Sequence, residues 1–291
     1  MQITLIGQTE GHAVQRLQEE ALKMGATLSA ISIDTVVFSV QNNTFSLFDE
    51  ENKNLMKSDC YIFRGIGDAD QEVMVIAKYL LQHGATVIEG MTAHGALLMD
   101  KLFLGAIGQS VPTLNYFMVQ SEQTLRIVQS ALTYPVVMKA TIGSMGMKVQ
   151  LVRQESELAE SYQAIGPRVI LQEYLPVDHD YRAIVIGGKY IGAYRRERTD
   201  GEFRMNVEGN TKAKTELPLA VISICEQAAQ QQNIEIAGID LLHHDNKWYV
   251  LEINTSPQFK YFESITGQNI AQKIIQYAIT KIRRKTNELR E

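Results

Sequence analysis

The chain has 291 residues, of which 45% are hydrophobic and 21% are charged. Its formal net charge of −5 argues against a nucleic-acid or anionic-membrane partner, because such partners favour a basic surface. No apolar run approaches the roughly 18 residues that span a bilayer, and the first residues lack the basic segment of a secretory signal. The two cysteines, Cys60 and Cys225, have no metal-site spacing. We therefore expect a cytoplasmic protein of about two ordinary domains.

The first part of the chain predicts a parallel sheet with helices on its faces. A strand over 3–6 is followed by a helical pattern that ends at Gly25 and by a strand over 27–33. A hairpin over 36–48, a strand over 60–63, a helix over 73–81 and a strand at 87–88 follow. The first turn lacks the Gly-x-Gly-x-x-Gly pattern, so NAD binding is not predicted.

Arg64 comes directly after one of these strands, at the position where ligands bind in open α/β sheets. The sequence leaves two readings of it open. Arg64 is either a ligand contact or a surface arginine whose charged end is in water.

The middle of the chain carries two lysines of interest. Lys101 lies on a helix predicted over 94–104, and Lys139 ends an apolar strand over 134–139. Lys139 needs an anion nearby if it is buried, and the Gly-containing loop over 140–147 could bring backbone N–H groups to a phosphate. The alternative is a simple hairpin with a flexible tip. A helix that begins at Ser156 ends near Gly166-Pro167, which we interpret as a subdomain boundary.

A group of arginines follows two strands, over 181–186 and 189–194, that are joined by the primed turn Gly187-Gly188. Four arginines in ten residues suggest an anion site, because guanidinium groups match phosphate and carboxylate. The alternative is an exposed strand edge kept soluble by charge. The four are Arg195, Arg196, Arg198 and Arg204.

A second hairpin carries the acids that best predict chemistry. Its strands, over 239–242 and 248–253, flank a polar turn at 244–246, and Glu252 and Asn254 share one strand face. With an even register, Asp240 faces Val250 and lies diagonal to Glu252, about 7 Å away. Carboxylate and amide oxygens are ligands of Mg²⁺, although acids on a solvated sheet face would look the same.

Taken in order, these motifs resemble the ATP-grasp superfamily and, within it, RimK-type α-L-glutamate ligases and related amino-acid ligases. The resemblance begins near residue 58 and is strongest over 169–275. It implies an α/β fold in three parts: an N-terminal α/β domain over 1–93, a small central domain over 94–168 and a C-terminal domain over 169–291. ATP would be gripped between the last two.

The resemblance also implies roles for individual residues. Two Mg²⁺ ions, or Mn²⁺, would be held by Asp240, Glu252 and Asn254, with Glu252 bridging them. The residues implied to bind ATP are Lys101, Lys139, Gln172, Glu173, Tyr174, Leu175, Asp180, Arg204 and Asn206. Those implied in catalysis are Arg196, Arg204 and Lys139. Candidate substrate contacts are Arg64, Arg182, Arg195, Ser256 and Gln258. The nearby Asp178 leaves the assignment of Asp180 open.

The implied activity is ligation of a carboxylate and an amine through an acyl phosphate, with glutamate as one amino acid that could be added to a peptide, a protein C-terminus or a small acid. Such chemistry needs positioning and charge neutralisation, and no nucleophilic Ser or Cys. The family usually has glycine where this chain has Gln258, and its loop differs at Met147-Lys148. The alternative is a non-catalytic nucleotide-binding module, although the retained ligands and Lys139 argue against it. Relatives often form homo-oligomers, so we expect one here.

Overall fold

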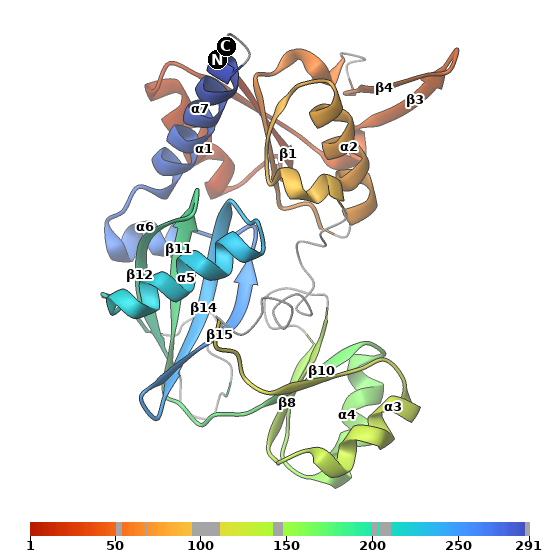
Figure 1. The fold of residues 1–291 in the computed structure, drawn as a ribbon, viewed down its shortest axis with the longest axis vertical. Coiled ribbons are helices and arrows are strands. Elements are labelled where there is room, and N and C mark those ends of the chain that lie inside the picture. The colour runs from red at the N-terminus through yellow and green to blue at the C-terminus, as the bar shows by residue number, and fades with distance from the viewer. Residues whose placement is uncertain are drawn as a thin grey trace.

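The structure is a computed structural model that describes residues 1–50, 54–67, 69–94, 111–141, 148–198, 203 and 211–288. Its described residues form three larger sheets and one separate two-stranded sheet (Figure 1). None of the described helices is long and apolar enough to cross a membrane.

The first sheet is parallel, with strand order β2-β1-β5-β6, as the βαβ pattern predicts. Alternate side chains of its strands face opposite ways: Ile3 and Leu5 pack with α1, whereas Ile6 packs with α2. Its elements are β1 (Gln2–Gly7), α1 (His12–Lys23), β2 (Thr27–Ile31), β5 (Cys60–Arg64), α2 (Asp70–Gln82) and β6 (Thr86–Ile88).

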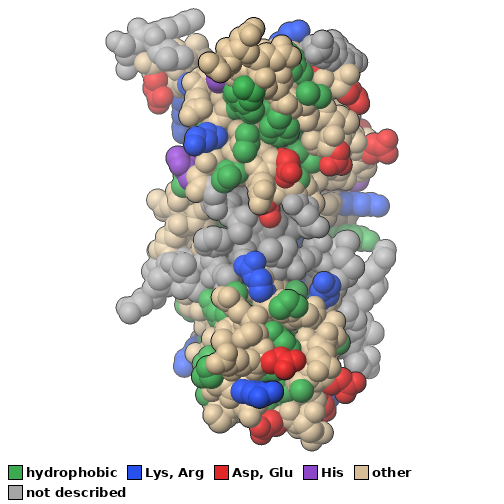
Figure 2. All heavy atoms as spheres, turned by 90° about the vertical axis from the view of Figure 1, so that its right-hand side faces the viewer, with side chains coloured by type: hydrophobic (Ala, Val, Ile, Leu, Met, Phe, Trp, Pro, Cys, Tyr) green, Lys and Arg blue, Asp and Glu red, His purple; other side chains and the backbone are tan. Residues whose placement is uncertain are grey.

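The predicted hairpin between β2 and β5 is β3 (Val37–Gln41) and β4 (Thr44–Phe48), which projects from the first sheet in Figure 1. Asn42 and Asn43 have φ of 50° and 59°, which matches a primed turn. The hairpin exposes the apolar side chains of Val37, Phe38 and Val40. Figure 2 shows hydrophobic side chains gathered on the upper part of the face from which it projects.

The second sheet is antiparallel, with order β7-β10-β8-β9, and α3 and α4 share its core. Ser121 caps α3, with a reciprocal bond to Thr124. Because β10 lies between β7 and β8, this sheet extends beyond residue 168. Its elements are β7 (Tyr116–Val119), α3 (Glu122–Val128), β8 (Val136–Ala140), β9 (Val149–Val152), α4 (Leu158–Ile165) and β10 (Val169–Glu173).

The third sheet is antiparallel, with order β13-β12-β11-β14-β15. Helix α5 packs on one face, while α6 and α7 pack on the other. Its elements are β11 (His179–Ile186), β12 (Lys189–Glu197), β13 (Lys212–Thr215), α5 (Leu219–Gln231), β14 (Ile236–His244), β15 (Lys247–Asn254), α6 (Lys260–Thr266) and α7 (Ile270–Glu288).

The arginine-bearing strand β12 is not the sheet edge that the alternative reading of its charges required. It pairs with β11 on one side and with β13 on the other, and Arg196 is 1% exposed. The edge reading is therefore wrong. Strand β13 was not predicted, because the alternating Lys-Ala-Lys-Thr pattern of this short strand is only weakly apolar.

The first and third sheets share one hydrophobic core. Ile3 and Leu17 of the first sheet and its helix pack in the same cluster as Ile184 of β11 and Ile274 of α7. Figure 1 accordingly shows α7 lying beside α1. The two units are thus held together by apolar burial rather than by polar contacts alone.

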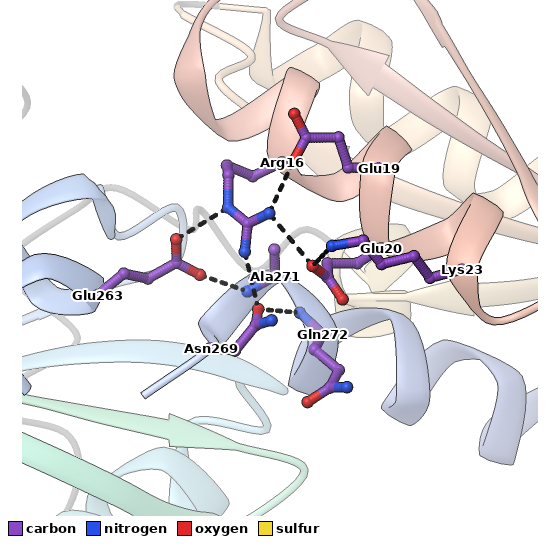
Figure 3. Close-up of polar contacts among 8 residues, drawn as sticks. All are labelled: Arg16, Glu19, Glu20, Lys23, Glu263, Asn269, Ala271 and Gln272. Atoms are coloured by element: carbon purple, nitrogen blue, oxygen red, sulfur yellow. Dashed lines mark hydrogen bonds and ion pairs between the residues drawn. The ribbon is translucent and has the colours of Figure 1, made fainter. Parts of the chain in front are cut away.

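Two polar junctions flank this shared core. Arg16 of α1 donates to Glu263 of α6 at 3.1 Å and to Asn269, just before α7, at 3.1 Å (Figure 3). In the second junction, the Glu89 carboxylate accepts the backbone N–H of Ile236 at 2.7 Å, and Glu235 accepts the backbone N–H of Glu89 at 2.6 Å. These contacts join α1 to α6 and to the start of α7, and they join the residue after β6 to the start of β14.

Candidate active site

The acid-bearing hairpin is β14 and β15, but its register differs from the even one that the sequence suggested. Asp240 lies directly opposite Glu252, and Leu241 lies opposite Val250, because a bulge leaves Leu251 as an extra residue in β15. The predicted pairing of Asp240 with Val250 is therefore wrong. The side chains of a directly opposed pair are closer, at about 4.5–5.5 Å between Cβ atoms, than those of a diagonal pair.

The bulge also decides which face each side chain takes. Val250 packs with Leu241 in the core under α5, whereas two residues later Glu252 turns to the opposite face with Asp240. Without the bulge, Val250 and Glu252 would share a face. The core therefore receives the apolar residue, and the acid is left on the polar side.

A buried cluster of two arginines and two aspartates occupies that polar face. Arg182 donates its Nε to Asp240 Oδ1 and its Nη2 to Oδ2, the latter at 2.7 Å. Arg196 Nη2 lies 3.1 Å from Asp240 Oδ2, and Arg196 also donates two bonds to Asp180 at 2.7 and 2.5 Å. All four are at least nine-tenths buried. Burial opposes ionisation of Asp240, but the two guanidinium groups outweigh it and lower the Asp240 pKa.

The three predicted metal ligands can still present oxygen atoms on one face. Glu252 is half-buried and makes no ion pair within the described ranges. Asn254 uses its amide nitrogen toward the Gly238 carbonyl at 3.4 Å, which leaves its side-chain oxygen available. Asp240 Oδ1 accepts the Arg182 Nε bond, and a carboxylate oxygen can accept a second ligand.

This donor set fits Mg²⁺, which takes a few protein oxygens and completes its octahedron with water or substrate phosphates. The described part of the chain holds no group of three or more His, Cys, Asp or Glu side chains that would form a closed cage. Two carboxylates and one amide would leave the other positions of the octahedron to water or a ligand. The affinity of this donor set for a metal would depend on the phosphates that the ligand brings.

On the second sheet, the structure brings together two of the predicted nucleotide contacts. Lys139 is 9% exposed and donates to Gln172 Oε1 at 2.9 Å, across neighbouring strands β8 and β10. This bond orients the ammonium group between the two strands.

The rest of the predicted adenine-binding linker joins β10 to β11. Glu173 is exposed, Tyr174 accepts a bond from Arg198 at 3.1 Å, and Leu175 packs against a small apolar cluster that includes Leu242. The linker therefore carries both polar and apolar side chains. Small-molecule sites combine the two kinds of contact.

The acids near position 180 are clearly separated by burial. Asp180 is 3% exposed and bound to Arg196, whereas the side chain of Asp178 is 92% exposed and lies 3.4 Å from Arg198. Arg195 pairs with Glu197 at 2.5 Å and is partly exposed. The predicted positions Lys101, Arg204 and Asn206, and the loop over 142–147, lie outside the described residues.

Three of the five predicted substrate contacts lie where β5 meets the loop after β15. Arg64 is 3% exposed and donates its Nη2 to the Pro257 carbonyl, so the reading of a solvated surface arginine is wrong. The Ser256 hydroxyl accepts the backbone N–H of Gly65 at 3.2 Å, and Gln258 is exposed. Sequence reasoning missed Phe259, whose ring lies 5.1 Å from Arg64 Cζ, because nothing local marks it.

A family model described as a RimK-like ATP-grasp domain matches residues 91–278, which is more than half of the chain. The chain belongs to the RimK-like ATP-grasp family. This result confirms the resemblance of its motifs.

Relatives and solved structures agree with this RimK-like assignment. A probable alpha-L-glutamate ligase of Haemophilus influenzae (strain 86-028NP) is 25% identical over 286 residues, which cover 91% of this chain and 93% of the relative. Another, from Picosynechococcus sp. (strain ATCC 27264 / PCC 7002 / PR-6), is 34% identical over 149 residues, 49% of this chain and 50% of that protein. This second match thus spans about half the relative's length.

Among solved structures, the ATP-grasp ligase PsnB complexed with minimal precursor, Mg and ADP has a TM-score of 0.71 and 19% identity. The match covers 97% of this RimK-like chain and 98% of PsnB. This likeness confirms the ATP-grasp fold of mixed helices and strands.

Proposed function

We propose that this RimK-like protein is an ATP- and Mg²⁺-dependent ligase that joins a carboxylate to an amine through an acyl phosphate. The observation that carries the proposal is the placement of Asp240, Glu252 and Asn254 on one face of the β14–β15 hairpin. The relatives named above are probable alpha-L-glutamate ligases, and PsnB was solved with Mg, ADP and a precursor. We accordingly propose an amino acid such as glutamate as one substrate and a peptide, protein C-terminus or small acid as the other.

The chain's own residues would contribute charge and position. Bound Mg²⁺, held by Asp240, Glu252 and Asn254, would supply neutralisation of the phosphate oxygens. Lys139 would donate to a phosphate, oriented by its bond to Gln172. Arg182 keeps Asp240 ionised and fixed. In the proposed reaction the substrate carboxylate attacks the γ-phosphorus and ADP leaves; the amine then attacks the acyl carbon, phosphate leaves, and the amine loses one proton.

A second candidate, a nucleotide-binding module without catalysis, has one observation in its favour. Three of the bonds described above already occupy the Asp240 carboxylate, which weakens it as a metal ligand. The open Glu252 and Asn254 oxygens favour the ligase.

The proposal can be tested by measuring ADP release with amino acids and acidic peptides, singly and in pairs, and by mass analysis of the products. A ligase should release one ADP for each amide formed, and the Glu252→Gln variant should lose this activity. Amide without ADP would refute the proposed mechanism. Tight ATP binding with no turnover across the panel would favour the non-catalytic module.

A further inference from the structure

Arg64 carries a buried positive charge that no described acid neutralises. Its side chain ends β5, and its bond to the Pro257 carbonyl is the one hydrogen bond that its guanidinium makes to the described residues. The Nε atom is shielded from solvent and has no acceptor within the part of the chain that the structure describes. The ring of Phe259 lies 5.1 Å from Cζ and attracts the cation, but it carries no net charge.

Such a group is costly to keep in a folded protein. A buried guanidinium is ordinarily paired with a carboxylate, as Arg182 and Arg196 are in the same molecule. Burial lowers the pKa of Arg64 to about 10, so it remains charged near neutral pH. The missing counter-charge is therefore expected to come from outside the described residues.

Close packing of the backbone places Arg64 near the candidate metal site. Its bond partner Pro257 packs against Gly238 so tightly that a Cβ on that glycine would lie 2.6 Å from the Pro257 Cβ. Gly238 pairs directly with Asn254. A second contact, from the Gly65 N–H to the Ser256 hydroxyl, holds the same loop. Only a few residues thus separate the guanidinium from a predicted Mg²⁺ ligand.

The position of Arg64 favours a substrate group over a nucleotide phosphate. In Figure 1 the third sheet lies between the first sheet, which carries Arg64, and the second sheet, which carries Lys139. A nucleotide bound near Lys139 and Gln172 would direct its phosphates to the metal ligands from the side of the second sheet. Arg64 approaches the same ligands from the other side, where the group that meets the phosphate must enter.

We propose that Arg64 binds a carboxylate group of the acid or amino-acid substrate. This inference rests on the proposed ligase function and names the recognition of its substrate. A guanidinium fork matches a carboxylate, and the stacking on Phe259 fixes its plane. Substrate binding would supply the counter-charge that the described residues lack.

The test uses full-length protein and the variant Arg64→Met, which keeps apolar bulk over Phe259 but removes the charge. Arg64→Lys keeps the charge without the fork, and Arg126→Met removes an exposed arginine of α3 as a matched control. Melting temperatures are measured without ligand, with L-glutamate, with inorganic phosphate, and with NaCl at equal ionic strength. A ligand that binds only the folded state raises the melting temperature.

We expect Arg64→Met to melt at or above the wild-type temperature without ligand, because it removes an unneutralised buried charge. L-Glutamate should raise the melting temperature of the wild type and of Arg126→Met, raise that of Arg64→Lys less, and leave that of Arg64→Met unchanged. A ligand-free Arg64→Met that melts lower than wild type would assign Arg64 a structural role and overturn the proposal. Stabilisation by phosphate and not by glutamate, or a glutamate shift that persists in Arg64→Met, would also overturn it.

Turnover provides a second readout where the substrate panel gives ADP release. Arg64→Met should raise KM for the carboxylate substrate roughly 10- to 100-fold, the usual loss for a hydrogen bond to a charged group, and leave KM for ATP unchanged. An unchanged substrate KM would contradict the proposal. If the wild type releases no ADP with any substrate, the ligase function fails, whereas the melting experiment still decides whether Arg64 binds a carboxylate.

Discussion

Asp240 and Glu252 face each other across the hairpin, yet we expect opposite effects on stability when each loses its charge. Glu252 makes no ion pair within the described ranges, and the charge it faces on Asp240 is already offset by two guanidinium groups. The amide of Glu252→Gln has nearly the same shape. The free energy of unfolding should therefore change by no more than about 0.5 kcal/mol, as for most substitutions that break no buried contact.

Asp240→Asn removes the one carboxylate that pairs with Arg182 among the described residues. Removing one partner of a buried ion pair costs about 3–5 kcal/mol, because the other charge is left uncompensated. Here that charge is on Arg182, since Arg196 keeps its two bonds to Asp180. At roughly 2–4 °C for each kcal/mol in a chain of this size, the melting temperature should fall by about 6–20 °C. If Asp240 and Glu252 served only as metal ligands, the two substitutions would change the stability of the metal-free protein equally.

Activity should respond differently from stability. Glu252→Gln should lower kcat by at least about a hundredfold, which corresponds to about 2.7 kcal/mol of transition-state stabilisation. The assays are thermal unfolding without nucleotide and ADP release with saturating ATP and Mg²⁺. The reasoning is refuted if Glu252→Gln destabilises the protein as much as Asp240→Asn, or if Glu252→Gln turns over at the wild-type rate.

Three further predictions follow from the same structure. Lys139→Met should raise KM for ATP by about tenfold or more, because a charged hydrogen bond to a phosphate is lost; an ATP titration of ADP release that gives an unchanged KM would remove Lys139 from the nucleotide site. Burial, with a contribution from Glu235, raises the pKa of Glu89 to about 8 from an ordinary 4.5. The folded state then binds more protons than the unfolded state, so this group's contribution to stability should be complete below pH 4.5 and be lost as pH rises through 8. Urea unfolding between pH 5 and 9 should show a smaller decline in Glu89→Gln than in wild type, and equal declines would contradict the assignment. Removal of divalent cations with EDTA should abolish ADP release and Mg²⁺ should restore it, whereas full activity in EDTA would exclude the metal site formed by Asp240, Glu252 and Asn254.

The sequence predicted most elements whose signals are local. The Gly187-Gly188 turn has φ of 58° and 73°, as expected for a primed turn, and the predicted hairpin over 36–48 forms β3 and β4. The order of lysine, linker and acids was also sufficient to suggest the family that the matched domain confirms. Short elements without a strong pattern, β13 and α6, were missed.

Burial and register were decided by packing between segments far apart in the chain. Arg64 and the carbonyl that it binds are 193 residues apart, so no local pattern could distinguish a buried arginine from a solvated one. Likewise, the bulge at Leu251 lets Val250 enter the core under α5 while Glu252 joins Asp240 on the polar face. A strand's own alternation cannot specify such a shift, because the free energy that favours it comes from the helix packed against the sheet. The sequence alone therefore determined which residues carry charge and oxygen, and the tertiary structure decided which of them meet.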